Sequence, residues 1–471
     1  MLFAEHPRPT TLGMLRDLEV RPFWLDDPSR PSPHAALAGD HTADLVVVGG
    51  GFTGLWTALL AKQQSPKRDV VLVDADRVAG AATGRNGGFL HASLTHGTAN
   101  GLARYADELP MLMRLGVENL HAIEAFVRER NIECDWRASG ELEVAFEPHQ
   151  LETLLEAAVA IRGAGERVDV LDASELQQRV RLAGAVGGTH DVDGIVMVNP
   201  ARLAWGLLDA CRDAGVRVYE HSAVRRMRRS QLGVRLEFDA ATIDAAGVVL
   251  ATNAAPSLLP AVRRRIVPVY DYALVTEPLT TEQWATIGWD GREGIKGAGN
   301  QFHYARRTAD DRILWGGYDA VYQRGEIGPQ FDGDPVVFGR LAEHFTAVFP
   351  TLAGVRFTHG WGGAIDTCSR FIPFWTRAFG GRVISIAGFT GLGVGSSRFA
   401  AGVGLAILDG RPHAALSLRM VRKAPVPFPP EPLRSIVIAV TQRSLARADA
   451  RGGRRDLWLR LLDRLGIGFD S

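Results

Sequence analysis

Three glycines and one aspartate stand at a spacing that suits chemistry with phosphate groups. Gly49, Gly51 and Gly54 follow a short apolar run, and Asp74 comes about twenty residues after the last of them. In this pattern the first glycine allows a tight turn, the second lets backbone approach a pyrophosphate, and the third lets a helix pack closely on a strand. An acid at the position of Asp74 can bind a ribose hydroxyl. These residues predict a dinucleotide site.

Two strands and a helix must position these residues. Residues 45–48 and 70–73 are apolar runs, typical of strands buried on both faces of a parallel sheet. The helix that opens after the glycines and runs to about residue 62 points its unpaired amides at the pyrophosphate. We therefore expect Phe52 and Thr53 in its first turn, and Ala75 beyond the second strand, to contact the cofactor. A glycine-rich turn in an unrelated α/β protein is the alternative, but it does not explain Asp74.

A run of small residues follows the second strand and ends in Gly84, Arg85, Asn86, Gly87 and Gly88. Here the sequence resembles the FAD-dependent amine and amino-acid oxidases of the D-amino acid oxidase, glycine oxidase and sarcosine oxidase superfamily, above all its γ-glutamylputrescine oxidase branch. The resemblance implies FAD as the cofactor. Small residues let the chain pass beneath a wide isoalloxazine, and the arginine and asparagine can donate to phosphate or ring oxygens. The alternative for the arginine is a charge on a surface loop.

The resemblance assigns further FAD contacts to later segments. Relatives contact adenine at the position of Val224, and the strand predicted at 248–252 passes the pyrophosphate. A helix predicted at 396–408 aims its N-terminal amides at the flavin, where they stabilise the negative charge of the reduced ring. The other positions implied are Thr252, Asn253, Trp361, Gly388, Thr390, Gly391, Leu392 and Gly393.

The resemblance also bears on how the flavin is held. Monomeric sarcosine oxidases attach it through a Cys that falls at Gly363, and other relatives attach it through a His that falls at Asn86. Both attachments are absent, so we expect non-covalent FAD. His91 and His96 lie near this region, and we interpret them as loop or core histidines.

The fold implied is an α/β FAD-binding, Rossmann-like domain of three layers with an inserted α+β substrate domain built on an antiparallel sheet. We expect an N-terminal arm at residues 1–42, whose aromatic side chains dock on the main body. The FAD-binding domain would take residues 43–96, 196–265 and 357–412. The substrate domain would take 97–195 and 266–356, and a C-terminal tail 413–471.

Candidate substrate residues lie on strand-like runs of the inserted domain. Tyr304 and Arg306 match a Tyr and an Arg of the γ-glutamylputrescine oxidase branch, and Tyr272 lies on a neighbouring run. The planar fork of an arginine suits a carboxylate, although a sheet-surface charge is the alternative for Arg306. Trp315 falls where sarcosine oxidases have a Lys that promotes reaction with oxygen, which puts rapid oxidase chemistry in doubt.

The composition narrows the class of protein. The chain has 471 residues, 46% of them hydrophobic and 23% charged, and 53 basic residues balance 53 acidic ones. The zero net charge favours neither nucleic acid nor an anionic membrane as a partner. No secretory signal or membrane-spanning run is evident at the sequence level. Three scattered cysteines indicate reduced thiols without a metal site, so we expect a cytoplasmic protein.

These features predict an enzyme that oxidises a carbon–nitrogen bond of an amine or amino acid by hydride transfer to flavin N5, with hydrolysis of the resulting imine. Its partners would be a small amine substrate and oxygen or another electron acceptor. The alternatives are a flavin dehydrogenase that reduces a partner protein or quinone, and a flavin-binding protein without turnover.

Overall fold

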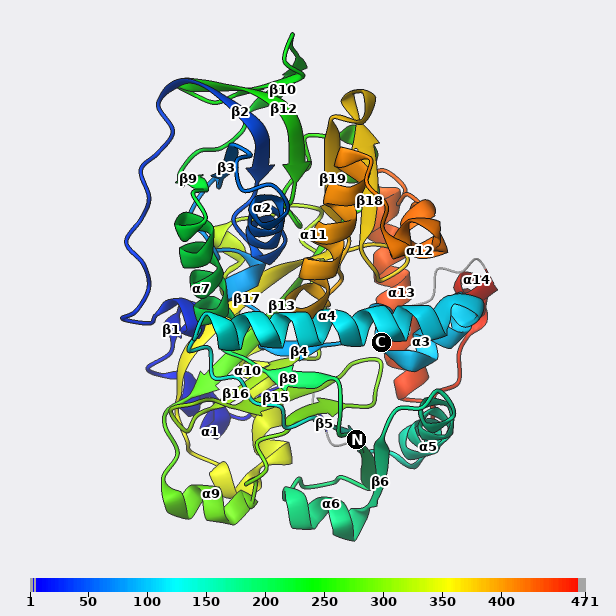
Figure 1. Cartoon of the computed structure of the whole chain (residues 1–471). Coiled ribbons are helices and arrows are strands. Elements are labelled where there is room, and N and C mark those ends of the chain that lie inside the picture. Colours follow the sequence, from blue (N-terminus) through cyan, green and yellow to red (C-terminus); the bar gives the residue numbers. More distant parts are fainter. Residues whose placement is uncertain (1–2, 4–5, 465–471) are drawn as a thin grey trace.

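An eight-stranded sheet lies in the upper part of the molecule as drawn in Figure 1. The computed structural model describes residue 3 and residues 6–464. The hairpin β10–β11 pairs with the first half of β12, and β19 pairs with its last residues. The strands are, in order across the sheet, β10 (Arg226–Arg229), β11 (Val234–Glu237), β12 (Ala241–Leu250), β2 (Gly39–Val48), β3 (Val70–Val73) and β9 (Arg217–Tyr219), with β19 (Val383–Ala387) and β18 (Phe374–Ala378) beyond β12.

The central strands of this sheet are buried on both faces, as the apolar runs predict. Leu45 and Val47 of β2 contribute to a core with α2 (Phe52–Gln64), α7 (Pro200–Asp213) and α11 (Gly393–Asp409). Val46 and Val48 face the opposite core, which β10 and β11 close. Side chains alternate between the faces of a strand, so residues 45–48 of β2 need to be apolar at every position.

A nine-stranded sheet lies below the first (Figure 1). It is mixed, not antiparallel as expected, because β1 pairs with β17 and β14 pairs with β5 in parallel. The helix α10 (Pro335–Val348) packs on one of its faces. The order is β1 (Glu19–Val20), β17 (Phe357–Thr367), β13 (Val267–Thr276), β16 (Ile313–Gly317), β15 (His303–Arg307), β14 (Gly294–Gly297), β5 (Glu141–Ala145), β7 (Gly187–Asp191) and β6 (Val168–Asp172).

Two expected boundaries change in the structure. The strand β17 belongs to the nine-stranded sheet, so the return to the first sheet comes after residue 367 and not at 357. The N-terminal arm contributes β1 to the same sheet. Its expected docking is confirmed, because Trp24 is 3% exposed and its Nε1 donates to the Asn86 carbonyl at 2.8 Å.

The remaining helices surround the two sheets. The long helix α4 (Leu109–Glu129) runs across the front of the molecule as drawn in Figure 1, at a height between the two sheets. A small third sheet pairs β4 (Phe89–His91) with β8 (Ile195–Met197). The other helices are α1 (Pro9–Leu12), α3 (Gly97–Tyr105), α4 (Leu109–Glu129), α5 (Pro148–Gly163), α6 (Ala173–Arg179), α8 (Pro260–Arg263), α9 (Thr281–Ile287), α12 (Arg419–Arg422), α13 (Leu433–Asp449) and α14 (Leu457–Arg464).

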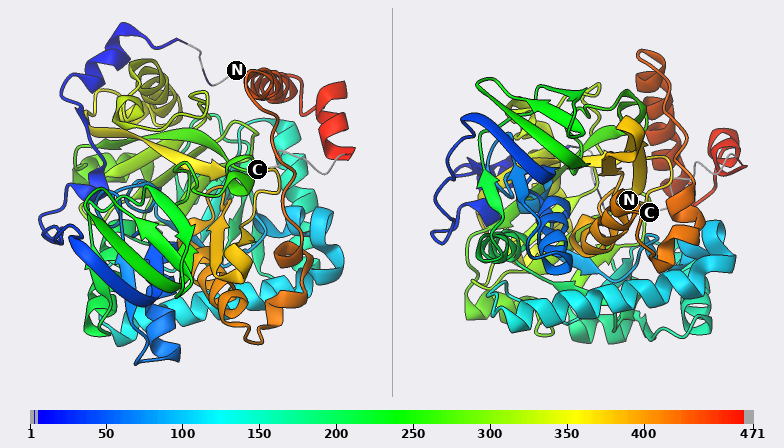
Figure 2. Two further views of the ribbon diagram at one scale, coloured as in Figure 1. Left: turned by 90° about the horizontal axis from the view of Figure 1, so that it is seen from above. Right: turned by 45° about the horizontal axis from the view of Figure 1, so that its top comes forward.

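The C-terminal tail forms α13 and α14, which lie at the edge of the molecule in both views of Figure 2. The Asp449 carboxylate at the end of α13 accepts bonds from the backbone of Asn300 and Gln301, which ties the tail to the turn between β14 and β15. In the part of the chain that the structure describes, no helix has the length and hydropathy needed to cross a membrane.

Candidate functional site

Four parallel strands end at one edge of the eight-stranded sheet. The last residues of β3, β2, β12 and β19 lie side by side in register. The glycine turn, Asp74, Thr252 with Asn253, and Gly388 follow directly from these ends. Ligands of open α/β sheets bind at the carboxyl ends of the strands. The sheet therefore gathers residues that lie far apart in the sequence, as the sequence pattern predicts.

Close backbone contacts account for two glycines of the turn. A Cβ on Gly54 would come 1.8 Å from the Gly49 carbonyl oxygen, so α2 can approach β2 only without a side chain there. Gly49 has φ +108°, and a Cβ on it would come 2.4 Å from the Ala251 carbonyl oxygen. The hydroxyl of Thr83 accepts a bond from the Phe52 N–H at 3.1 Å. The loop after β3 is thereby tied to the first turn of α2.

The acid at the end of β3 is held by the glycine turn. The Asp74 carboxylate accepts the Gly50 N–H at 2.6 Å and the Asp76 N–H at 2.8 Å. Burial raises its pKa. A carboxylate oxygen can accept more than one hydrogen bond, so each oxygen keeps capacity for a ribose hydroxyl.

A second acid at this edge, Glu220, was not predicted. It follows β9, is 2% exposed, and accepts the N–H groups of Val78 and His34 at 2.6 Å each. The Arg77 Nε lies 3.3 Å from the same carboxylate. The sequence could have suggested Glu220 as an acid at the end of a strand. Its role in holding the loop after Asp74 depends on the pairing of β9 with β3, which the sequence does not show.

The predicted donors of the 84–88 loop are engaged by the protein itself. The Arg85 guanidinium donates to the Asp332 carboxylate at 2.6 Å and to the Gly362 carbonyl at 3.0 Å. The Asn86 side chain donates to two carbonyls of its own loop and accepts the Gly88 N–H at 2.8 Å. Arg85 is therefore not a surface charge, and the fixed side chains shape the loop. Their contact with a cofactor stays a prediction.

Arg306 is fully buried and braces this loop. Its Nη1 donates to the carbonyls of Val198 at 2.6 Å and Gly88 at 3.2 Å, and its Nη2 lies 3.3 Å from the Asp135 carboxylate. Its carbon Cζ lies 5.3 Å from the ring centre of Trp24. Burial lowers its pKa to about 10, so it stays charged at neutral pH. Both expected roles, a substrate anchor and a sheet-surface charge, disagree with this environment, and we assign Arg306 as a positioning residue.

Tyr304 and Tyr272 lie on opposite faces of the nine-stranded sheet. The Tyr304 hydroxyl donates to the Asp271 carboxylate at 2.7 Å, and its ring lies against Gly87, where a Cβ would come within 2.9 Å. Tyr272 packs on Phe338 of α10 instead, and its hydroxyl donates to a backbone carbonyl. Because neighbouring residues of a strand point to opposite faces, Asp271 takes the place expected for Tyr272.

Trp315 also faces α10. Its Nε1 donates to the Leu341 carbonyl at 3.0 Å, and it stacks on His303. Trp315 therefore lies on the face of the sheet opposite Tyr304, and we base no conclusion about oxygen on it.

A row of charged side chains continues from Tyr304 across the same face. Lys296 pairs in register with Tyr304 and with Glu143, and its Nζ lies 3.4 Å from the Glu143 carboxylate. Burial lowers the Lys296 pKa, but the carboxylates of Glu143 and Glu141 outweigh it and the net pKa is raised. The sequence shows only an isolated lysine at this position, so its place in the row was not predicted.

The carboxyl of Glu141 lies 3.6 Å from the His91 imidazole, but the two do not form an ion pair at neutral pH. Burial raises the pKa of Glu141 to about 8 and lowers that of His91 to about 3, so both groups are neutral at pH 7. Burial likewise lowers the pKa of His96 to about 4, and its ring contacts Phe371. Both histidines are thus core or loop residues, as interpreted from the sequence.

The turn between β19 and α11 is held by an acid that was not predicted. The Asp366 carboxylate accepts the Gly388 N–H at 2.6 Å and the Thr390 N–H at 3.3 Å. Gly388 and Gly391 have φ of +87° and +97°, which favours glycine, and Leu392 precedes the first residue of α11. A Cβ on Gly395 would meet the His91 carbonyl at 2.0 Å, so the first turn of α11 packs on β4.

The other predicted positions lie around the same edge. Trp361 donates from Nε1 to the Arg85 carbonyl at 2.8 Å. Asn253 has φ +49° directly beyond β12. Val224 is half-buried against the core on the far face of the sheet. Most of the predicted cofactor positions thus lie around this edge, whereas Val224 lies on the far face of the sheet and Tyr272 faces α10.

Comparison with known proteins agrees with this geometry. A family model described as "FAD dependent oxidoreductase" matches residues 44–404. The chain is 31% identical over 357 residues to the gamma-glutamylputrescine oxidoreductase of Escherichia coli K12, covering 75% of this chain and 80% of that protein. It is 26% identical over 389 residues to a probable oxidoreductase of Haemophilus influenzae, OrdL, covering 80% and 85%. The glycine oxidase structure from Geobacillus kaustophilus aligns with a TM-score of 0.67 at 19% identity, covering 82% of this chain and 100% of that one.

Replacement of Glu141 by glutamine is expected to flatten the pH dependence of stability above pH 6.5. The folded protein holds a proton on Glu141 up to about pH 8, whereas the unfolded chain loses it near 4.5, so the free energy of unfolding falls as pH rises toward 8. His91 acts in the opposite direction, but its contribution is complete near 6.5, where the unfolded imidazole loses its proton.

Thermal unfolding midpoints between about pH 6.5 and 9 measure this effect. The wild type should lose stability more steeply than Glu141→Gln, and the exposed Glu152→Gln should behave as the wild type. Equal slopes in all three proteins would contradict the assignment.

Replacement of Arg306 by methionine is expected to lower the free energy of unfolding by about 3–5 kcal/mol, because Asp135 and two carbonyls lose a buried donor. Arg225→Met is the control, since its ion pair with Asp239 is exposed and contributes little to stability. Urea unfolding monitored by tryptophan fluorescence gives the comparison. Similar small losses in both variants would show that Arg306 does not brace the loop.

Proposed function

Because the chain belongs to the family of FAD-dependent oxidoreductases, we propose that it oxidises a carbon–nitrogen bond of an amine or amino acid between FAD and the nine-stranded sheet. One observation supports this position for the flavin. The loop of residues 82–88 runs from the first turn of α2, through the Thr83 bond, to the ring of Tyr304. A flavin beside this loop would face Tyr304, Asp271 and Lys296.

The residues present fit FAD. Gly51 stands where a Cβ would crowd Thr83 at 2.8 Å. In the first turn of α2 the Phe52 N–H is bonded to Thr83, and the N–H groups that follow it remain for a phosphate. Asp74 retains acceptor capacity toward a ribose, and the first turn of α11 offers further amides for the flavin ring. We propose that the cofactor is non-covalent, since position 363 is glycine and the Asn86 side chain is bonded to its own loop. When bound, FAD supplies an acceptor for the hydride that leaves the substrate carbon.

The chain's own groups then bind the amine and handle protons. The amine lone pair forms the carbon–nitrogen double bond as the hydride departs, and water adds to the imine and releases the nitrogen. Burial raises the pKa of Asp271 to about 6, so at neutral pH its carboxylate is charged and accepts a hydrogen bond from the Tyr304 hydroxyl. The phenol oxygen is then left to accept an N–H of the substrate, so this pair can orient the amine.

We propose that Lys296 and Glu143 recognise the remote end of the substrate. The Lys296 ammonium group and the Glu143 carboxylate lie 3.4 Å apart and so complement a zwitterionic substrate. Lys296 would pair with the carboxylate of the substrate, and Glu143 with its ammonium group. A relative named for gamma-glutamylputrescine supports a substrate whose amine is remote from an amino-acid group.

Within this proposal, the FAD-binding domain takes the eight-stranded sheet and the helices on it, and the substrate domain takes the nine-stranded sheet including β1 and β17. Oxygen, a partner protein or a quinone remains open as the acceptor of electrons. The absence of membrane-crossing helices from residues 6–464 is compatible with a cytoplasmic enzyme.

Oxidation of a carbon–oxygen bond is the second candidate, because a stretch of 150 residues is 30% identical to an L-2-hydroxyglutarate dehydrogenase of Indibacter alkaliphilus. An anaerobic panel of amines, amino acids and 2-hydroxy acids separates the two. Loss of flavin absorbance with an amine or amino acid supports the proposal, and loss only with a hydroxy acid overturns it. Lack of reduction by any member would favour a flavin-binding protein without turnover. Hydrogen peroxide formed on readmission of air would identify an oxidase.

Replacement of Asp74 by alanine is expected to raise the FAD dissociation constant roughly ten- to a hundredfold, because a charge-assisted bond is lost. Asp76→Ala, two residues on and with its side chain 78% exposed, is the control and should bind as the wild type. Titration of apoprotein with FAD, followed by flavin fluorescence, gives both constants. Unchanged affinity in Asp74→Ala would show that the ribose contact is misplaced.

Replacement of Lys296 by methionine is expected to weaken binding of a carboxylate-bearing substrate about tenfold or more while sparing an analogue without the acid group. Lys67→Met on the exposed turn after α2 is the control. Anaerobic flavin-reduction rates against substrate concentration separate affinity from the rate at saturation. Equal losses for both substrates would mean that Lys296 acts on the structure and not on the carboxylate.

A further inference from the structure

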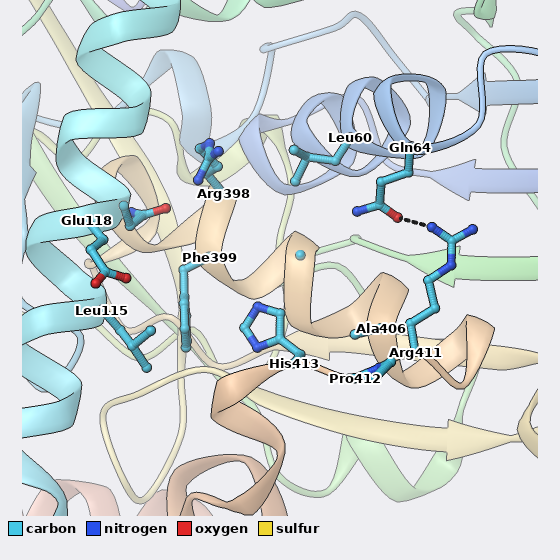
Figure 3. Close-up of a pocket in the computed structure, with 12 residues that line it drawn as sticks. Leu60, Gln64, Leu115, Glu118, Arg398, Phe399, Ala406, Arg411, Pro412 and His413 are labelled. Carbon is cyan, nitrogen blue, oxygen red and sulfur yellow. Dashed lines mark hydrogen bonds between the residues drawn. The ribbon is translucent and has the colours of Figure 1, made fainter.

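A pocket of ≈ 300 Å³ lies between α2, α4, α11 and the turn after α11 (Figure 3). None of its lining residues belongs to the site described above. Its volume falls at the lower end of the roughly 300–1,000 Å³ typical of small-molecule sites. Leu60, Leu115 and Phe399 give it an apolar wall, and Arg398 and Asn119 are among its polar groups.

Arg398 brings a positive charge to this pocket without a counter-charge. Among residues 6–464 it forms no recorded ion pair or hydrogen bond, and its Nε is buried without a partner. Its guanidinium carbon lies 5.7 Å from the ring centre of Trp56, and burial lowers its pKa. A partly desolvated cation without an acid is costly, and an anionic ligand would remove that cost.

Asn119 supplies an independent unpartnered group. It is 5% exposed, and its Nδ2 donates to the Gly395 carbonyl at 2.8 Å, which fixes the orientation of the amide. Its Oδ1 is buried without a partner in the described part of the chain. Buried polar atoms are normally satisfied, and an amide oxygen can only accept, so this oxygen has room for a water that bridges it to a bound acid.

The other charged side chains that line the pocket already have partners in the protein. Arg411 donates to Gln64 at 3.0 Å and lies 3.8 Å from the Asp409 carboxylate. Glu118 is 61% exposed at the rim and lies 3.7 Å from Arg114. The unbalanced charge of the pocket is therefore that of Arg398.

We propose that this pocket binds a small organic carboxylate, whose acid group pairs with Arg398 and whose apolar part lies against Leu60, Leu115 and Phe399. The planar guanidinium suits a bidentate carboxylate. The apolar wall favours an acid with a short hydrocarbon chain over a plain inorganic anion.

Two variants and a control test this site in the FAD-loaded protein. Arg398→Gln removes the charge. Gly402→Leu fills the pocket, since a Cβ on Gly402 meets nothing closer than the His413 Nε2 at 3.9 Å, and leucine is a better helix former than glycine. Arg443→Gln removes an exposed arginine of α13 that does not line the pocket.

Isothermal titration with hexanoate, phosphate and hexylammonium is the measurement. We expect hexanoate to bind the wild type and Arg443→Gln with equal affinity, and Arg398→Gln and Gly402→Leu at least about tenfold more weakly. Phosphate and hexylammonium should bind more weakly than hexanoate. Undetectable hexanoate binding to the wild type, unchanged affinity in Arg398→Gln or Gly402→Leu, or a preference for phosphate or hexylammonium would each overturn the proposal.

Discussion

The contact between Gly54 and the Gly49 carbonyl limits how the first strand, turn and helix can pack. A side chain at Gly54 would overlap that oxygen, so its absence lets α2 begin directly over the end of β2. Gly49 makes a comparable approach to the Ala251 carbonyl and brings β12 to the same edge. Because β3, β2, β12 and β19 are parallel and in register, the glycine turn, Asp74, residues 252–253 and the turn before α11 all start from this edge. Larger residues at the two glycines would push the strand ends apart even in the absence of a ligand.

The second constraint is the buried guanidinium of Arg306, which joins the loop before β4 to the nine-stranded sheet. Its charge is offset by the Asp135 carboxylate and by two carbonyl groups, which replace the water that a buried guanidinium has lost. Arg306 thereby holds Gly87 against Tyr304 and sets the spacing between the loop of residues 82–88 and the nine-stranded sheet. A family position that suggests a substrate anchor thus has a positioning role in this chain.

The part of the site that follows from local pattern could be predicted. Strands 45–48 and 70–73, the glycine turn and Asp74 depend on short-range periodicity and turn chemistry, and all lie where the sequence indicates. The helix expected at 396–408 is α11, which begins three residues earlier, at Gly393. Contacts across the fold could not be predicted. Glu220, Asp366 and Lys296 acquire their roles from strands that are distant in sequence.

Tyr272 and Trp315 both face α10, and the sequence could not show this, because the face of a strand on which a residue lies depends on register. The mixed character of the nine-stranded sheet likewise comes from long-range pairs, β1 with β17 and β14 with β5. Short alternating runs do not reveal whether such partners are parallel.

The central claim is that a carbon–nitrogen bond is oxidised and the imine then hydrolysed. The most direct measurement is mass spectrometry of the product formed in ¹⁸O-labelled water from the substrate that reduces the flavin, in a single anaerobic turnover quenched before the carbonyl exchanges with solvent. We expect a carbonyl product that carries ¹⁸O together with one equivalent of released ammonia or amine. A carbonyl that retains the substrate's own oxygen, with no nitrogen released, would contradict it and establish oxidation of a carbon–oxygen bond.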